Sequence, residues 1–154
     1  MNIQWTRARL AMLTPEQVHD LFKLRVDVFV VEQACAYAEL DGLDKEAMHV
    51  LGHVDDGSLI AYCRILPPGS DGYPHIGRVV VRQDVRGNQV SRLLMSQALE
   101  VVKDLHGDDR SAVAAQSHLE HFYASFGYER TGPDYDWDGI PHVDMVLRGR
   151  ARLA

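Results

Sequence analysis

The chain has 154 residues and a net charge of −6, with 16 Lys and Arg against 22 Asp and Glu. Its 46% hydrophobic and 25% charged residues are the balance of a folded protein, and its length is that of one domain. The negative charge opposes nucleic-acid binding, and no apolar run approaches the ~20 residues that cross a bilayer. We therefore expect one domain over residues 1–154, without nucleic acid or a membrane as partner.

The start of the chain and the two cysteines indicate a compartment. Residues 1–10 alternate polar and apolar side chains and lack the apolar core of a signal peptide. Cys35 and Cys63 form no CxxC pair and predict no disulfide framework. Together these features favour a cytoplasmic protein with reduced cysteines.

The first part of the chain predicts a strand followed by a helix. Residues 3–10 are strand-like, and Thr14-Pro15-Glu16-Gln17 combines a Thr N-cap, a Pro at the first helical position and a Gln that completes a capping box. Apolar residues at three-and-four spacing predict that this helix runs to Glu32. Its buried stripe is expected to hold Val18, Leu21, Phe22, Val26 and Phe29. Residues 34–46 have no regular pattern.

Three strands are predicted next. Residues 48–54 and 59–66 flank Asp55-Asp56-Gly57-Ser58, which has the composition of a hairpin turn, so these strands should pair antiparallel. A third strand over residues 76–82 contains the apolar triplet Val79-Val80-Val81, which is typical of a strand covered on both faces. We expect that strand near the centre of the sheet.

The second part of the chain predicts two helices among strands. Helical spacing from Val90 ends at Gly107, residues 111–116 suit a buried strand, and Ser117-His118-Leu119-Glu120 predicts a second capping box. The helix that begins there should end at Gly127 and precede closing strands at 128–135 and 142–147. The order β-α-β-β-β-α-β-α-β-β predicts an α/β fold in which helices flank a mixed central sheet.

One window concentrates positive charge. Between residues 78 and 92 four arginines face only one acid, and the window passes from a buried strand into a helix through Arg86-Gly87-Asn88-Gln89-Val90-Ser91. Unpaired backbone N–H groups and the positive end of the helix dipole then lie beside the arginines. Such a turn suits a pyrophosphate, although an ordinary solvated turn has the same composition.

A second set of residues surrounds Tyr123, which follows Gln116 and His118 one turn into a helix. A phenol near the carboxyl edge of the preceding strand can donate a proton to a leaving group. The alternative is one more aromatic side chain of a buried helix stripe. No metal is expected, because the pairs His49 with His53 and His118 with His121 lack an HExxH motif or a Cys at ligand spacing.

With these elements and windows, the chain resembles the GNAT superfamily of N-acetyltransferases. In that superfamily the pattern (Arg/Gln)-x-x-Gly-x-(Gly/Ala) at a helix start binds the pyrophosphate of acetyl-CoA, and Arg86, Gln89 and Ser91 stand at its defined positions, with both glycines replaced. The ElaA-type branch is similar over nearly the whole chain. The matching stretches are 24–33, 41–42, His49, 76–79, 115–119, 122–127 and 138–142.

The resemblance implies that acetyl-CoA is the co-substrate and lies where two central strands splay apart. Pantetheine would pair with the backbone near Val79 and Val81, and Tyr123 would be the general acid. Acetyl transfer would then proceed by direct attack of an amine. The cofactor-binding residues implied are Val79, Val80, Val81, Arg86, Gly87, Asn88, Gln89, Val90, Ser91, Gln116 and Tyr123.

The same resemblance implies an acceptor that is a small-molecule or peptide amine, and it also allows a homodimer. The implied acceptor-side residues are Arg25, Phe29, Glu32, Gln33, Asp41, His49 and His142. The general base stays open among His118, His49, Glu32 and Asp41. For His49, His118 and His142 the alternative is a hydrogen-bonding role that holds residues 34–46 and the last turn in place.

Two other functions stay open. A non-catalytic module that senses acyl-CoA is favoured only by the two replaced glycines. An enzyme similar to the acyl-homoserine-lactone synthases is suggested by residue types at approximate spacing, namely Arg25, Phe29, Asp41, Asp44 and Arg64. That hypothesis ranks last, because the Trp expected after Phe29 is absent and the second half resembles the ElaA-type branch.

Overall fold

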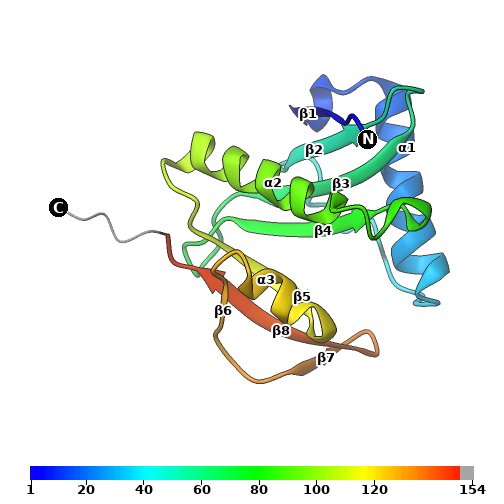
Figure 1. Ribbon diagram of the computed structural model, residues 1–154. Helices are drawn as coiled ribbons and strands as arrows, with labels where there is room; N and C mark the ends of the chain where they lie inside the picture. The colour runs from blue at the N-terminus through cyan, green and yellow to red at the C-terminus, as the bar shows by residue number, and fades with distance from the viewer. Residues whose placement is uncertain (150–154) are drawn as a thin grey trace.

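The computed structural model describes residues 1–149, so residues 150–154 of the expected domain lie outside the described part. One sheet runs through it in the order β1-β2-β3-β4-β5-β8-β6, with β7 paired to β8 (Figure 1). Within the described residues β4 and β5 are the one pair of strands that runs parallel, so the prediction of a mixed sheet is confirmed. The strands are β1 (Gln4–Arg9), β2 (Met48–His53), β3 (Leu59–Leu66), β4 (His75–Val81), β5 (Ser111–Gln116), β6 (Glu129–Arg130), β7 (Tyr135–Trp137) and β8 (Ile140–Leu147).

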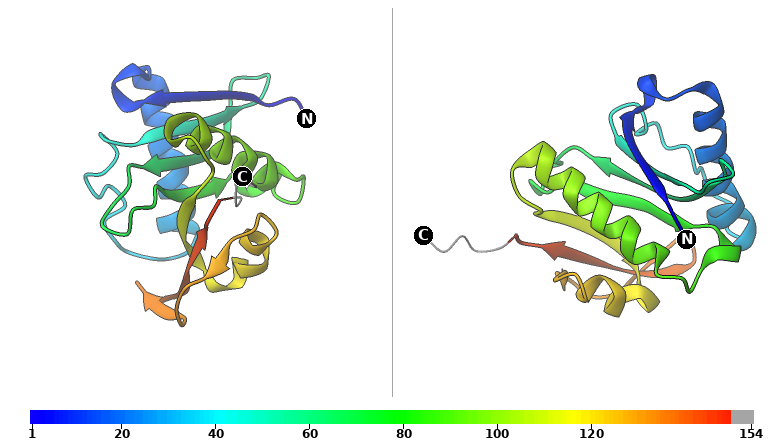
Figure 2. Two further views of the ribbon diagram at one scale, coloured as in Figure 1. Left: turned by 90° about the vertical axis from the view of Figure 1, so that its left-hand side faces the viewer. Right: turned by 45° about the horizontal axis from the view of Figure 1, so that its top comes forward.

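Helices cover both faces of the sheet (Figure 2). Leu21 and Leu24 pack against Tyr62 in one hydrophobic cluster, whereas Leu94 packs with Cys63 in the other. Because neighbouring strand residues point to opposite faces, α1 and α2 lie on opposite sides of β3. The helices are α1 (Pro15–Arg25), α2 (Val90–His106) and α3 (Glu120–Ala124), with short helical segments η1 (Leu10–Met12), η2 (Val26–Glu32), η3 (Gln83–Val85) and η4 (Ser117–Leu119).

The first helix begins as predicted but ends differently. The Thr14 hydroxyl accepts from the Gln17 N–H at 3.1 Å and the Thr14 N–H donates to the Gln17 side chain at 2.9 Å, so the capping box is confirmed. From Val26 to Glu32 the backbone is π-helical instead of α-helical. This stretch is rich in β-branched valine, which crowds a regular α-helix. The widened turn buries Val28 more than the expected Val26 and Phe29.

Two predictions for the second half are wrong. No side-chain cap begins η4, and α3 starts only at Glu120, so Ser117 and Glu120 form no capping box. The expected strand 128–135 is split into β6 and β7. Pro133 lacks the N–H that a strand needs, so the chain leaves the sheet there and returns as a hairpin with β8 through Asp138 and Gly139, both at positive φ.

Candidate active site

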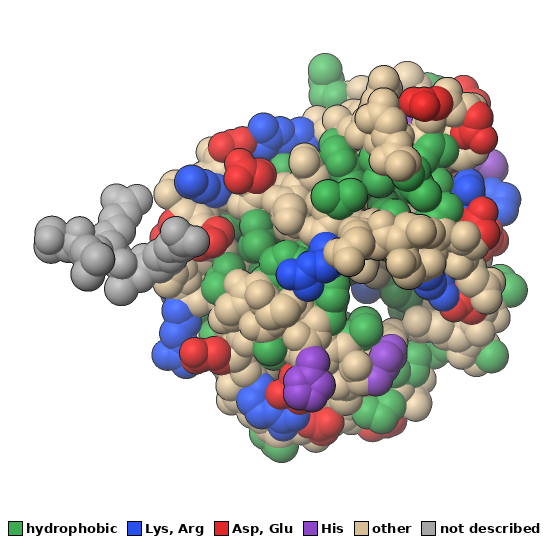
Figure 3. Space-filling view, viewed as in Figure 1, with side chains coloured by type: hydrophobic (Ala, Val, Ile, Leu, Met, Phe, Trp, Pro, Cys, Tyr) green, Lys and Arg blue, Asp and Glu red, His purple; other side chains and the backbone are tan. Residues whose placement is uncertain are grey.

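The central strands β4 and β5 touch only near their beginnings. His75 pairs with Ala112, and the Ala112 N–H donates to the Pro74 carbonyl at 2.9 Å. After that pair the two strands make no further ladder pairs, and we call the unpaired region between residues 77–81 of β4 and 113–116 of β5 the splay cleft. The surface is hollowed between α2 and the part formed by α3 and β8, with hydrophobic side chains around the hollow (Figure 3).

The edge of β4 that faces the splay cleft presents backbone groups. Val80 pairs with β3, and the Arg82 N–H donates to Ile60 of that strand at 2.8 Å. Since peptide groups alternate in direction along a strand, those of Val79 and Val81 face the cleft. An extended ligand can pair with such an edge as an added strand does.

The turn between η3 and α2 has the geometry of an anion site. Gly87 and Gln89 have positive φ values of +85° and +64°, which brings the chain sharply into the helix. The first N–H groups of α2 have no partner inside the helix, and its first turn holds no acid. Asn88 is exposed, whereas Val90 is buried and anchors the turn. Donors without a partner inside the helix and the positive end of the helix dipole suit a phosphate group.

The Arg86 side chain is hydrogen-bonded to Glu32 and to the edge of β4, and not to the turn before α2. Its Nη1 and Nη2 donate to the Glu32 carboxylate at 2.6 and 2.9 Å, and its Nε donates to the Val81 carbonyl at 3.0 Å. The hydrogen bond from Arg86 lowers the pKa of Glu32. Arg86, expected on the cofactor, and Glu32, expected on the acceptor side, therefore bind each other. In this conformation Arg86 also covers a carbonyl of the cleft edge.

Tyr123 lies on α3 inside the larger hydrophobic cluster and is only 6% exposed. Its ring meets Phe122 and Tyr128 edge-on, with centroids 5.1 and 6.0 Å apart. Burial raises the pKa of the Tyr123 phenol above its ordinary value, so the group keeps its proton at neutral pH. A protonated, desolvated phenol is suited to donating a proton and not to accepting one.

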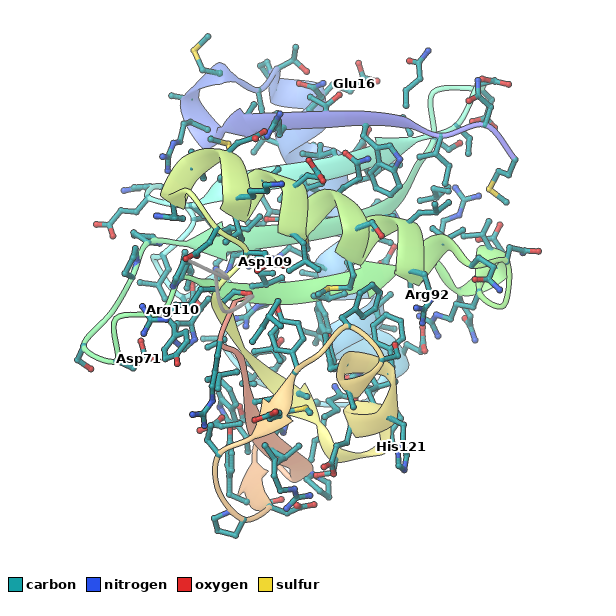
Figure 4. The ribbon with its side chains drawn as sticks, turned by 60° about the vertical axis from the view of Figure 1, so that its left-hand side comes forward. Glu16, Asp71, Arg92, Asp109, Arg110 and His121 are labelled. Atoms are coloured by element: carbon teal, nitrogen blue, oxygen red, sulfur yellow. The ribbon has the colours of Figure 1, made fainter. Side chains whose placement is uncertain are left out.

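Contacts join the start of α2 to the residues directly after α3, the helix that carries Tyr123. Arg92, on the first turn of α2, donates to the Ser125 hydroxyl at 3.0 Å and its guanidinium lies 4.7 Å from the centre of the Phe126 ring. Figure 4 shows Arg92 at that end of α2 and His121 on the outer side of α3. The turn and the helix that carries Tyr123 are thus joined directly.

The acceptor-side residues approach the end of β5. Gln116 donates through Nε2 to the Gln33 side chain at 3.3 Å, and Cys35 Sγ contacts the Asp138 carbonyl at 3.4 Å. These contacts join the segment after η2 to β5 and to the β7–β8 turn. Phe29 is half-buried against the cluster under α1 and stabilises that packing.

Several predicted acceptor residues belong to a buried ion cluster. Arg25 is completely buried and donates to Glu39 and Asp44, each at 2.6 Å. Arg64 donates to Asp41 at 2.5 Å and to Asp44 at 3.0 Å. The hydrogen bond from Arg64 lowers the pKa of Asp41. Arg25 has no exposed face in this structure, and its guanidinium is occupied by these acids.

Four members of this cluster were not predicted as acceptor residues, and of these Asp44 and Arg64 were named only for the lactone-synthase alternative. Arg78, counted in the phosphate window, donates through Nε to Glu39 at 2.7 Å and so points to the ion cluster. Glu39 lies in the irregular segment, where no periodicity or motif distinguishes one acid from the next. The buried ion cluster comprises the buried residues Arg25, Glu39, Asp44 and Arg64, together with Asp41 and Arg78 at its partly exposed edge.

The three histidines of interest have different surroundings. His49 is completely buried, with Nδ1 2.6 Å from the Tyr62 hydroxyl and Nε2 2.8 Å from the Asp44 carbonyl, and burial lowers its pKa. His142 Nδ1 lies 2.7 Å from the Ile140 carbonyl. Both therefore make the hydrogen bonds of the structural alternative, and both ring nitrogens of His49 have partners. His118 is exposed on η4, directly after β5.

The described residues 1–149 contain neither a candidate metal-ligand cluster nor a candidate membrane span. In this part of the chain no group of three His, Cys, Asp or Glu side chains is arranged to hold a metal ion. Likewise, none of its helices has the length and apolar character needed to span a membrane.

A mixed sheet whose parallel central strands splay beside a helix N-terminus defines an acyl-CoA N-acyltransferase fold. Residues 10–148 match the family model described as "Acetyltransferase (GNAT) domain". Protein ElaA of Escherichia coli is 41% identical over 147 residues, which are 94% of this chain and 95% of ElaA. The chain therefore belongs to the GNAT acetyltransferase family, and within it to the ElaA type.

Solved structures agree with that assignment. An acyl-CoA N-acyltransferase from Pseudomonas aeruginosa superimposes with a TM-score of 0.89 at 38% identity, over 94% of this chain and 99% of that one. Crystalline Escherichia coli ElaA gives 0.86 at 39% identity, with the same coverage. The acyl-homoserine-lactone synthase LasI gives 0.78 at 15% identity, over 94% and 89% of the two chains, which shows a shared fold alone.

Proposed function

We propose that this protein transfers an acetyl group from acetyl-CoA to an amine by direct attack. The proposal rests mainly on one observation, the splay cleft with anion-binding N–H groups at one end and the buried Tyr123 on a helix beside it. The ligand that suits this arrangement is long, anionic at one end and reactive at the other. Family membership supports acyl-CoA as its class.

In the proposed mechanism acetyl-CoA supplies the activated acetyl thioester. A backbone N–H at Val79, which faces the splay cleft, would stabilise the negative charge that develops on the thioester oxygen. The amine nitrogen forms the new bond to the carbonyl carbon as the carbon–sulfur bond breaks. Tyr123 gives its proton to the departing sulfur, and a base takes the proton of the amine.

Each proposed role, in cofactor binding or in proton transfer, falls to residues at a different place in the site. The turn Gly87, Asn88, Gln89 and Ser91 would hold the pyrophosphate, and Val79 and Val81 would pair with pantetheine. His118 is the candidate base with an exposed ring, whereas both nitrogens of His49 are in use. This division leaves the exposed imidazole, directly or through water, to accept the proton of the amine.

The acceptor is proposed as a small-molecule or peptide amine. The acids of residues 34–46 suggest a cationic acceptor, but Glu39, Asp41 and Asp44 are paired with arginines. Their charge is therefore largely neutralised, and we assign the acceptor no charge preference. The same pairing weakens the lactone-synthase hypothesis, because Arg25, Asp44 and Arg64 stabilise the fold.

The test uses the purified chain. We expect calorimetry to detect acetyl-CoA binding, and thiol release from acetyl-CoA to depend on an added amine, in a panel that includes peptide amines. Binding without release for every amine would favour the sensor module. Lactone production from S-adenosylmethionine would support the lactone-synthase alternative, and absence of acetyl-CoA binding would contradict the proposal.

A further inference from the structure

Strand β4 contains a bulge beside the splay cleft. Arg64 pairs with Gly77 and Tyr62 pairs with Val80, so two residues, Arg78 and Val79, lie opposite Cys63 alone. Arg78 has a φ of +50°, in the left-handed region that side chains other than glycine rarely adopt. Such a conformation persists only where the surrounding structure holds it.

The side chain of Arg78 is held by a clamp, which we define as Glu39 with its immediate partners. Arg78 Nε donates to Glu39 Oε2 at 2.7 Å and Nη2 donates to the Glu39 carbonyl at 3.2 Å. Nη2 also lies 3.4 Å from Asp41, and the guanidinium lies over the Tyr37 ring at 5.8 Å. Arg78 therefore has partners on several sides.

Glu39 is itself immobilised. Its residue is only 4% exposed, Arg25 Nε donates to the same Oε2 at 2.6 Å, and the Tyr37 hydroxyl donates to Oε1. A carboxylate fixed by two other side chains holds its partner in one place. The clamp thus connects the irregular segment after η2 to the bulge of the central strand.

We propose that Glu39 is a positioning residue for acetyl transfer: by clamping Arg78 it maintains the bulge and keeps the Val79 N–H directed at the thioester oxygen. Without the bulge, β4 would pair regularly with β3, and a shift of one residue reverses the direction of every peptide group. This inference rests on the proposed function, because the Glu39–Arg78 clamp would position the Val79 N–H that contacts the thioester oxygen.

The test compares Arg78→Gly with Arg78→Ala. Both variants remove the guanidinium, but only glycine adopts positive φ without a clamp. The probes are acetyl-CoA labelled with ¹³C at its carbonyl and free CoA, which lacks that carbonyl. A hydrogen bond from Val79 shifts the bound carbonyl resonance downfield and lowers the Kd of acetyl-CoA relative to that of CoA.

We expect Arg78→Ala to lose the downfield shift. The Kd of CoA divided by the Kd of acetyl-CoA should fall about threefold to tenfold, the range of one hydrogen bond. Arg78→Gly should keep most of both signals. Glu39→Gln should behave as Arg78→Ala does, and the double variant Glu39→Gln/Arg78→Gly should recover the shift. If Glu39→Gln fails to fold, the two single variants at position 78 decide the question.

Equal loss in Arg78→Gly and Arg78→Ala would overturn the inference, because the guanidinium would then act on the ligand itself. Unchanged signals in both variants would also overturn it, since the bulge would not need the clamp. If the wild-type protein binds acetyl-CoA without a downfield shift, the oxyanion contact is wrong while the cofactor assignment stands. If it binds no acetyl-CoA, the proposed function fails as well.

Discussion

The turn that follows η3 and the bulge within β4 differ in whether their hydrogen-bond donors have partners in the protein. At the turn after η3 the first backbone N–H groups of α2 have no partner inside the helix, and no acid stands in the first helical turn. At the bulge, Arg78 and Arg25 share the buried carboxylate of Glu39. The first arrangement leaves donors for a ligand, whereas the second uses them to hold the fold. Unpaired donors, and not arginines as such, therefore indicate the binding surface.

The largest effect is expected where a buried charge loses its partner. Asp44 Oδ1 accepts from Arg25 and Arg64, so Asp44→Asn should lower the free energy of unfolding by about 3–5 kcal/mol. Urea denaturation measures this loss. The matched control is Asp134→Asn, which removes the half-exposed partner of Arg130 and should cost less than about 1 kcal/mol. Equal losses of unfolding free energy in the two variants would show that burial does not increase the cost of removing an ion-pair partner.

A smaller effect, on rate instead of stability, is expected at the phenol beside the cleft. Tyr123→Phe keeps the ring and removes the proton, so kcat should fall about a hundredfold while the Kd of acetyl-CoA stays nearly constant. Tyr128→Phe is the control, because its hydroxyl lies 2.6 Å from that of Ser111 and has no proposed catalytic task. Wild-type turnover in Tyr123→Phe would make Tyr123 structural.

The smallest effect tests which group competes for Arg86. If the Glu32 pair gives way to phosphate, Arg86→Ala should weaken acetyl-CoA binding and Glu32→Gln should strengthen it, each by about threefold to fivefold. Calorimetry at two salt concentrations measures both, and the wild-type affinity should fall as salt rises. Glu129→Gln, at an exposed pair with Arg148, is the control. Weaker binding in both variants would mean that the Glu32–Arg86 pair itself supports the site.

The cofactor side of the fold was predictable because its signals are local. The capping box at Thr14 joins residues within one helical turn, and the apolar spacing between Val90 and Gly107 repeats every three or four residues. Both helices begin where predicted. A local sequence pattern predicts wrongly where the chain adopts a different backbone geometry at that place. The pattern at Ser117 matches a capping box, yet a short 3-10 turn precedes α3 and places that serine outside the cap position.

The sequence by itself determined the order of elements as far as α3, the mixed sheet and the turn before α2, since periodicity, caps and turn residues act over short stretches. Only the tertiary structure decided which charged side chains are free. Arg86 and Glu32 are 54 positions apart, and Arg78 and Glu39 are 39 apart. Whether an arginine meets a carboxylate over such separations depends on how the strands and the irregular segment pack, and no local pattern encodes that pairing.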